Sequence, residues 1–134
     1  MAKILIVEDS PLQQELYREF VEMWGHECLV SDNASDAVRL AEEAAPNVVI
    51  MDLSILVSPN GIQNRRAGAD ALQAIRLKPS LARTRVIAIT AQPEYRHYAP
   101  DVDDHAFQVV IKPSRPDFED LRQAVEAALT TPYA

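Results

Sequence analysis

Five short runs of apolar residues divide the sequence into regular units. They occupy residues 3–7, 28–30, 48–51, 86–89 and 107–111. Each run is too short for a helix, and most are rich in β-branched residues, which favours β-strands. Continuous rather than alternating apolar character is typical of strands that are buried on both faces, as in a parallel sheet. The pattern therefore predicts five strands of such a sheet.

The segments between these runs carry apolar residues at helical spacing. They predict helices over about 11–24, 35–45, 68–77 and 117–129. Segment 93–105 predicts only a poor helix, because Pro100 interrupts it. The buried stripe of the first helix is predicted to contain Leu12, Leu16, Phe20 and Met23.

Alternation of five strands with helices of this length makes five βα units. Such alternation requires parallel strands joined by right-handed crossovers, and so an α/β fold with a doubly wound, five-stranded parallel sheet. The flavodoxin-like strand order for five units is 2-1-3-4-5, with the ligand site at the switch between strands 1 and 3. We expect a single (βα)5 domain over residues 1–134.

The composition agrees with one soluble domain. Of the 134 residues, 48% are apolar and 25% are charged, values typical of a globular protein. With 20 acidic residues against 13 Lys and Arg, the net charge of −7 disfavours nucleic acid as a direct partner. The longest uncharged run, residues 53–64, is too short to span a membrane, and no signal peptide precedes the first strand. We expect a cytoplasmic protein without membrane association.

The cysteine and the histidines predict no metal centre. Cys28 is the only cysteine, which excludes a disulfide framework, and it is predicted to be a small buried residue. His26, His97 and His105 fall in different connections and are predicted to be surface residues. Any metal site in this chain should therefore be built from oxygen ligands.

Charged or reactive side chains follow four of the five predicted strands. They are Glu8 and Asp9, Asp52, Thr90 and Lys112. In the order 2-1-3-4-5 these four strands are neighbours about 4.8 Å apart, so their ends lie on one rim, where open α/β sheets bind ligands. We expect these residues to meet although they are far apart in the sequence.

This set of side chains suits phosphoryl transfer to an aspartate. Three carboxylates on one rim repel one another unless a cation lies among them, and a solvent-open site of oxygen ligands suits Mg²⁺. Lys112 can pair with a second anion, and the Thr90 hydroxyl can bond one of its oxygens. The metal and the lysine then neutralise the developing charge while an ionised Asp52 acts as the nucleophile.

At these positions the chain resembles the receiver domain of two-component response regulators. The resemblance extends from Lys3 to about Leu129 and rests on four motifs at successive strand ends. The motifs are Glu8-Asp9, the strand that ends at Asp52, Thr90-Ala91 and Lys112-Pro113. The resemblance implies a phosphoacceptor signalling protein rather than an enzyme, one that catalyses only its own phosphorylation and dephosphorylation.

The resemblance also implies a role for each site residue. Asp52 accepts the phosphoryl group, Thr90 bonds one of its oxygens and Lys112 pairs with it. The implied ligands of Mg²⁺ are Glu8, Asp9, Asp52 and the backbone carbonyl of Ser54. The family also has a cis bond before Pro113, which turns the lysine inward. The implied partners are a sensor histidine kinase or histidine phosphotransfer protein and a downstream protein target, and a homodimer is compatible with the family.

Two departures from the family concern the conformational switch. Residues 53–67 are longer than the usual connection after the phosphoacceptor and are predicted to be a long loop, either a tolerated surface insertion or a lid or kinase-docking surface. Val109 stands where the family often has a Tyr or Phe whose rotamer follows phosphorylation. Phe107, two residues earlier, is expected on the same strand face. We therefore expect residues 53–67 and 90–105 to carry most of the response.

Three other functions fit the sequence less well. An aspartate-nucleophile phosphatase needs an acid two residues after its nucleophile, where this chain has Ser54. A flavin carrier needs a phosphate-binding loop after the first strand, where the acidic segment 8–11 has the wrong charge. A receiver-like binding module regulated without phosphorylation stays open, although the complete set of site residues argues against it. No output domain follows Leu129, so the sequence fits a stand-alone receiver or a piece of a longer protein.

Overall fold

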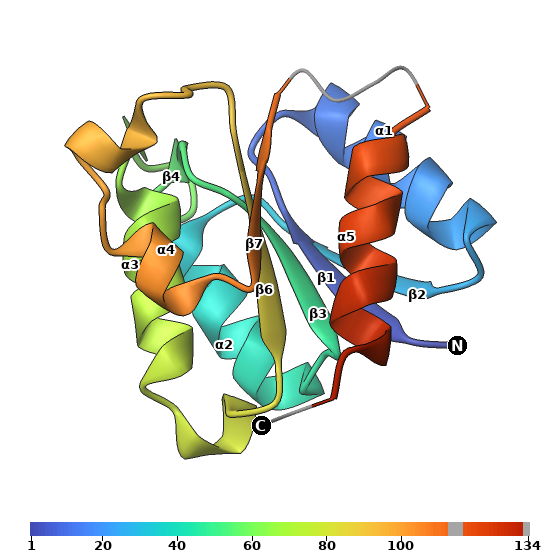
Figure 1. The fold of residues 1–134 in the computed structure, drawn as a ribbon. Helices are drawn as coiled ribbons and strands as arrows, with labels where there is room; N and C mark the ends of the chain where they lie inside the picture. Colours follow the sequence, from blue (N-terminus) through green and yellow to red (C-terminus); the bar gives the residue numbers. More distant parts are fainter. Residues whose placement is uncertain (113–116, 133–134) are drawn as a thin grey trace.

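The computed structural model describes residues 1–112 and 117–132, which form a five-stranded parallel sheet between two layers of helices (Figure 1). The strands of this sheet stand in the order β2-β1-β3-β6-β7. Their bounds are β1 Lys3–Val7, β2 Glu27–Ser31, β3 Val48–Asp52, β6 Arg85–Thr90 and β7 Gln108–Ile111. The predicted fold class and flavodoxin-like strand order are confirmed.

The helices cover both faces of the sheet (Figure 1). One layer consists of α1 Pro11–Met23 and α5 Glu119–Thr130, and the other of α2 Ala34–Ala44, α3 Ala67–Arg76 and α4 Val102–His105. Before the short α4, only a 3-10 turn, η2 Tyr95–His97, forms, which confirms that this segment is a poor helix. None of the described helices has the length and apolar character of a membrane span.

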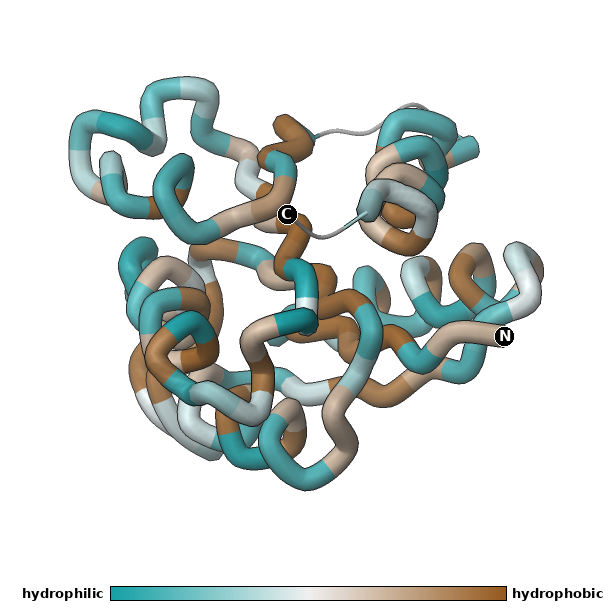
Figure 2. The backbone as a smooth tube through the Cα atoms, turned by 60° about the horizontal axis from the view of Figure 1, so that its bottom comes forward, coloured by the Kyte–Doolittle hydropathy of each residue, from teal (hydrophilic) through white to brown (hydrophobic). Residues whose placement is uncertain are grey.

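Alternate residues of the central strands face the two helical layers and form two cores. On β1, Leu5 and Val7 pack in the core of α2 and α3, while Ile4 and Ile6 pack in the core of α1 and α5. All four side chains are fully buried. Hydrophobic residues, brown in Figure 2, accordingly follow the central strands. Burial on both faces explains why these strands read as continuous apolar runs.

The edge strands β2 and β7 depart from this pattern, because an edge strand is covered less completely. Cys28 on β2 is half-buried, so the prediction of a buried cysteine is wrong.

Phe107 packs in the core of α1 and α5, whereas Val109 packs in the opposite core. The expectation that they share a face is therefore wrong. Alternation holds only within a strand, and Phe107 lies before the start of β7.

The buried face of α1 also differs from the predicted stripe. Tyr17 and Val21 are its buried residues, whereas Leu12 and Met23 are 77% and 69% exposed. The Tyr17 ring packs against Phe118 at the start of α5, with ring centroids 5.2 Å apart. The aromatic body of a tyrosine is apolar although its end is polar. The predicted stripe left Tyr17 out, and it is therefore rotated from the face that is buried.

Residues 53–67, predicted to be a long loop, contain a two-stranded antiparallel hairpin. In it, β4 Ile55–Leu56 pairs with β5 Gln63–Asn64. Gly61 N donates a hydrogen bond to Ser58 O at 2.9 Å and closes the turn between the strands. Asn60, at the third position of that turn, has a φ of 56°, which is typical of a type II turn after a proline. We call this segment, residues 55–64, the β4–β5 hairpin.

The β4–β5 hairpin is anchored beside the start of α2. Ile55 is fully buried in the core of α2 and α3. Leu56 forms a parallel bridge with Asn33, and Ser35 N donates a hydrogen bond to Val57 O at 3.2 Å. These contacts hold the hairpin near the carboxyl ends of β1 and β3, which is where the candidate site lies.

Candidate functional site

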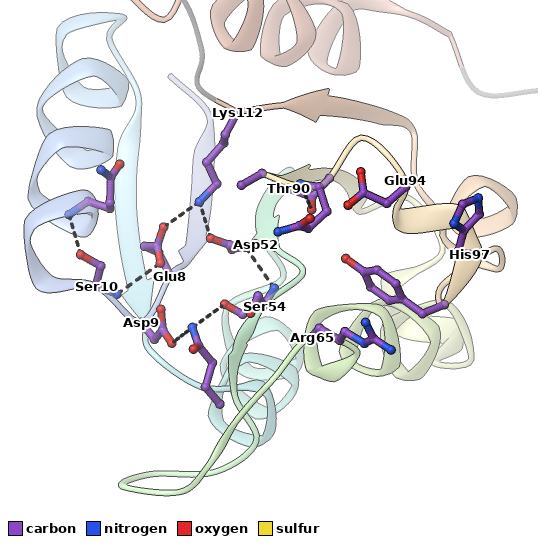
Figure 3. A pocket seen from close by; sticks show the side chains of 15 residues that line it. Glu8, Asp9, Ser10, Asp52, Ser54, Arg65, Thr90, Glu94, His97 and Lys112 are labelled. Carbon is purple, nitrogen blue, oxygen red and sulfur yellow. Dashed lines mark hydrogen bonds and ion pairs between the residues drawn. The ribbon is translucent and has the colours of Figure 1, made fainter.

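The carboxyl ends of β1, β3, β6 and β7 border one pocket of about 590 Å³ (Figure 3). All of the predicted site residues line it, namely Glu8, Asp9, Asp52, Ser54, Thr90 and Lys112. The opposite wall contains Gln63, Arg65, Glu94, His97 and Tyr98. The fold thus brings together the residues that the strand-end argument expected to meet.

Asp52, the last residue of β3, is only 5% exposed and is bound on both carboxylate oxygens. Its Oδ2 lies 2.6 Å from Lys112 Nζ, and its Oδ1 accepts a hydrogen bond from Ser54 N at 3.0 Å. Lys112 Nζ also lies 3.4 Å from Glu8 Oε1. The lysine therefore bridges two carboxylates that end neighbouring strands (Figure 3).

This charge cluster changes the proton affinities of its members. Burial, and then the nearby Asp52 carboxylate, raise the pKa of Glu8 to about 7, although Lys112 offsets part of the effect. Burial alone would lower the pKa of Lys112, but Asp52, Tyr17 and Glu8 outweigh it and hold this pKa above its ordinary value. The lysine is therefore a permanent cation in the pocket, and Glu8 takes up a proton near neutral pH.

Close packing of α3 holds the backbone at the end of β3. Gly68 N donates a hydrogen bond to Leu53 O at 3.0 Å, and a Cβ at Gly68 would lie 2.2 Å from Asp52 O. Leu53 N in turn donates to Ile89 O of β6 at 3.0 Å. Since no other side chain fits at position 68, glycine is required for the helix to approach Asp52 this closely.

Asp9 faces the hairpin rather than the lysine. Its Oδ2 accepts a hydrogen bond of 3.0 Å from Gln63 Nε2. The same nitrogen donates to Ser54 O at 3.3 Å. One amide therefore joins two of the oxygens that the family resemblance assigns to Mg²⁺. The sequence gives no indication of this role for Gln63, because it depends on the register of the hairpin.

Thr90 lies at the end of β6 and is 3% exposed. Its Oγ1 accepts a hydrogen bond from Gln92 N at 3.1 Å, so the hydroxyl hydrogen is still available as a donor. Its carbonyl oxygen accepts a hydrogen bond from Lys112 N at 2.7 Å. This backbone contact places the lysine and the threonine on adjacent strand ends.

The opposite wall of the pocket is more exposed than the strand ends. The Arg65 guanidinium lies over the Tyr98 ring, 4.3 Å from its centroid. His97 is exposed, as predicted, and lines this wall. His26 and His105 are half-buried, so the surface prediction is wrong for them; His26 Nδ1, for example, accepts a hydrogen bond from Ala2 N.

The oxygen ligands of the pocket fit a magnesium ion. Among the described residues, no group of three or more His, Cys, Asp and Glu side chains is arranged to hold a metal. Mg²⁺, however, keeps several waters and needs only one or two protein carboxylates. Asp9 Oδ2 and Ser54 O converge on a single amide nitrogen, and Ser54 N binds the Asp52 carboxylate. Asp9, Asp52 and the Ser54 carbonyl therefore match the ion, and Glu8, like Asp52, contacts Lys112. The cis bond expected before Pro113 lies outside the described residues.

Comparison with known families agrees with this geometry. Residues 4–126 match the response regulator receiver domain. The chain belongs to this family. The predicted resemblance is thereby confirmed, and with it the assignment to two-component signalling rather than to a flavin carrier.

Relatives of this receiver domain include two named regulators. It is 41% identical over 66 residues to protein PilH of Pseudomonas aeruginosa, an alignment that covers 49% of this chain and 54% of PilH. It is 28% identical over 88 residues to the polar-differentiation response regulator DivK of Brucella anthropi, covering 66% and 65%. The matched region thus spans less than two-thirds of either relative.

Solved structures show the same fold. Vibrio cholerae chemotaxis protein CheY4 superimposes with a TM-score of 0.78 at 22% identity, covering 96% of this chain and 98% of CheY4. TrrA of Thermotoga maritima, solved in complex with Mg²⁺ and beryllofluoride, gives a TM-score of 0.77 at 25% identity, covering 96% and 99%. The receiver fold therefore extends over nearly the whole chain.

Proposed function

We propose that this receiver domain accepts a phosphoryl group on Asp52 from the phosphohistidine of a sensor histidine kinase or a histidine phosphotransfer protein. The observation that carries the proposal is the position of the Asp52 carboxylate, which ends β3 at the pocket with Lys112 Nζ 2.6 Å from Oδ2. Asp9 and the Ser54 carbonyl stand beside it as ligands for Mg²⁺. Membership of the receiver family supports the same assignment.

In the transfer, a carboxylate oxygen of Asp52 bonds to phosphorus while the bond from phosphorus to the donor imidazole nitrogen breaks. The imidazole keeps the electron pair and takes a proton from water. Mg²⁺, when bound, supplies neutralisation of the phosphoryl charge. Lys112 exchanges its contact with the carboxylate for one with a phosphoryl oxygen, and the Thr90 hydroxyl donates a hydrogen bond to another.

The phosphorylated domain would signal through protein contacts, and the structure offers a route to its surface. Val109 has no ring to change its rotamer as the family's aromatic residue does. The hairpin side of the pocket is instead joined to the segment after β6 by Arg66. Arg66 Nη1 donates to Tyr98 O at 2.7 Å and pairs with Asp101 at 3.0 Å. These contacts support a response in residues 53–67 and 90–105.

Acetyl phosphate and Mg²⁺ provide a direct test, with the intact protein weighed by mass spectrometry. Wild type is expected to gain one base-labile phosphoryl group, and Asp52→Asn is expected to gain none. Asp104→Asn, which alters an exposed aspartate outside the pocket, is the matched control and should label like wild type. Labelling of Asp52→Asn at the wild-type level would overturn the proposal and favour a module regulated without phosphorylation at this residue.

A further inference from the structure

The side chain of Gln63 lies between two oxygens of the proposed metal site. Its Nε2 donates to Asp9 Oδ2 at 3.0 Å and to Ser54 O at 3.3 Å. A side-chain amide nitrogen carries two hydrogens, so these two contacts use both of its donors. The amide thus satisfies the oxygens that a cation would otherwise satisfy.

This contact and metal binding exclude each other. Mg²⁺ lies about 2.0–2.1 Å from its oxygen ligands, so an ion bound to Asp9 Oδ2 and Ser54 O occupies the space toward which both oxygens point. The Gln63 amide hydrogens point into that same space. Both the ion and the amide group carry positive charge toward the oxygens, and they therefore compete for them.

We propose that Gln63 is a gate for the magnesium site, which the β4–β5 hairpin holds closed until the ion displaces the amide. The inference rests on the proposed function, since it assumes that Asp9 and Ser54 bind Mg²⁺. It assigns a purpose to the insertion at 53–67: the insertion sets the Mg²⁺ concentration at which the receiver becomes competent.

The fold holds the gate in register but leaves it movable. Gln63 pairs with Leu56 across the hairpin, and Leu56 bridges to Asn33, which keeps the Gln63 backbone beside the pocket. The Gln63 residue itself is exposed, so its side chain can rotate into water without any change in the hairpin. Opening therefore removes two solvent-accessible hydrogen bonds and no buried apolar contact.

The test is a calorimetric titration of the full chain with Mg²⁺. Gln63→Met keeps the length of the side chain but removes both donors, and Gln63→Ala removes the amide entirely. Both variants are expected to bind Mg²⁺ about three- to tenfold more tightly than wild type, because the ion no longer displaces two exposed hydrogen bonds. Ile62→Ala, an exposed neighbour in the same hairpin, is the matched control and should bind like wild type.

An unchanged affinity in both Gln63 variants would overturn the gate. A weaker affinity would also overturn it, because it would mean that the amide turns its oxygen to the ion and serves as a ligand. Asp9→Ala separates this inference from the proposed function. Loss of binding in Asp9→Ala with unchanged affinity in Gln63→Met contradicts only the gate. Equal binding by Asp9→Ala and wild type contradicts the metal site itself.

Discussion

The two walls of the pocket are held in different ways. On the strand-end wall, Glu8, Asp52 and Thr90 are 2%, 5% and 3% exposed, and each ends or follows a strand of the central sheet. On the hairpin wall, Gln63 and Arg65 are exposed and lie in or beside a hairpin with two residues in each strand.

Under the proposed function, the strand-end wall carries the reaction and the hairpin wall adjusts it. The strand ends are positioned by ladder hydrogen bonds and by two buried cores, so their geometry changes only if the sheet changes. The hairpin wall reaches the same oxygens through exposed side chains, which can move or be replaced at little cost in stability. A rigid wall suits residues that take part in the reaction, and a wall of movable side chains suits residues that adjust it.

The largest effect is expected from the glycine that supports the strand-end wall. Gly68→Ala places a Cβ where Asp52 O lies 2.2 Å away, and should lower the free energy of unfolding by about 3 kcal/mol or more. Urea unfolding followed by circular dichroism measures it. Gly25→Ala is the control: its φ is 91° but no atom lies within 4 Å, so backbone strain of about 1–2 kcal/mol is its only expected cost. Equal losses in the two variants would mean that the close approach of α3 is unimportant.

A smaller, pH-dependent effect is expected at the charge cluster. Lys112→Met leaves Glu8 and Asp52 facing each other and should cost about 2–3 kcal/mol at pH 8, less than for a fully buried pair because Lys112 is partly exposed. In wild type the pKa of Glu8 is raised to about 7 although Lys112 lowers it, so removal of the lysine raises this pKa further, and the folded variant binds the extra proton from about pH 4.5 to above pH 7. Stability of the variant should therefore fall as the pH rises through this range, and the loss should be smaller at pH 5.

Urea unfolding at both pH values, in the presence of a metal chelator, measures this prediction. Arg39→Met, which removes exposed pairs with Asp36 and Glu43, is the matched control and should leave stability almost unchanged at either pH. A loss in Lys112→Met that is the same at pH 5 and pH 8 would argue against repulsion between the two carboxylates.

The smallest change is expected beside the hairpin wall, at Arg66, which follows the hairpin but does not line the pocket. Arg66→Met removes the ion pairs with Asp101 and Asp70 and the bond to Tyr98 O, and should cost about 1 kcal/mol. The Arg66 hydrogen bond lowers the pKa of Asp101, so this stabilisation is present above about pH 4 and is lost as the pH falls through the lowered value. Arg65→Met, which removes only the contact with the Tyr98 ring, should cost less. A loss in Arg66→Met that is as large at pH 2 as at pH 7 would rule out a contribution from the ion pair.

The sequence was sufficient to predict the strand-end wall. Buried parallel strands appear as apolar runs, and parallel topology puts their ends on one rim, so Asp52, Thr90 and Lys112 could be placed together without coordinates. Their roles in the reaction remain predictions. The position of the rim could be predicted because all strands of a parallel sheet end at the same edge.

The hairpin wall could not be predicted in the same way. Its turn leaves a signal, because Pro59 and Asn60 suit the second and third positions of a type II turn. Strands of two residues, however, show no periodicity to set their register. Without the register, Gln63 could not be placed beside Asp9, and the insertion could only be described as a long loop.

Hydrogen exchange with and without Mg²⁺ and the phosphoryl mimic beryllofluoride tests most directly whether chemistry on the strand-end wall is transmitted through the hairpin wall. Protection is expected to change in residues 53–67 and 90–105 of wild type, and Asp52→Asn is expected to show none of these changes. Protection changes that are confined to β7 and α5, with none in the hairpin, would contradict transmission through the hairpin wall. Equal changes in Asp52→Asn and wild type would contradict it as well.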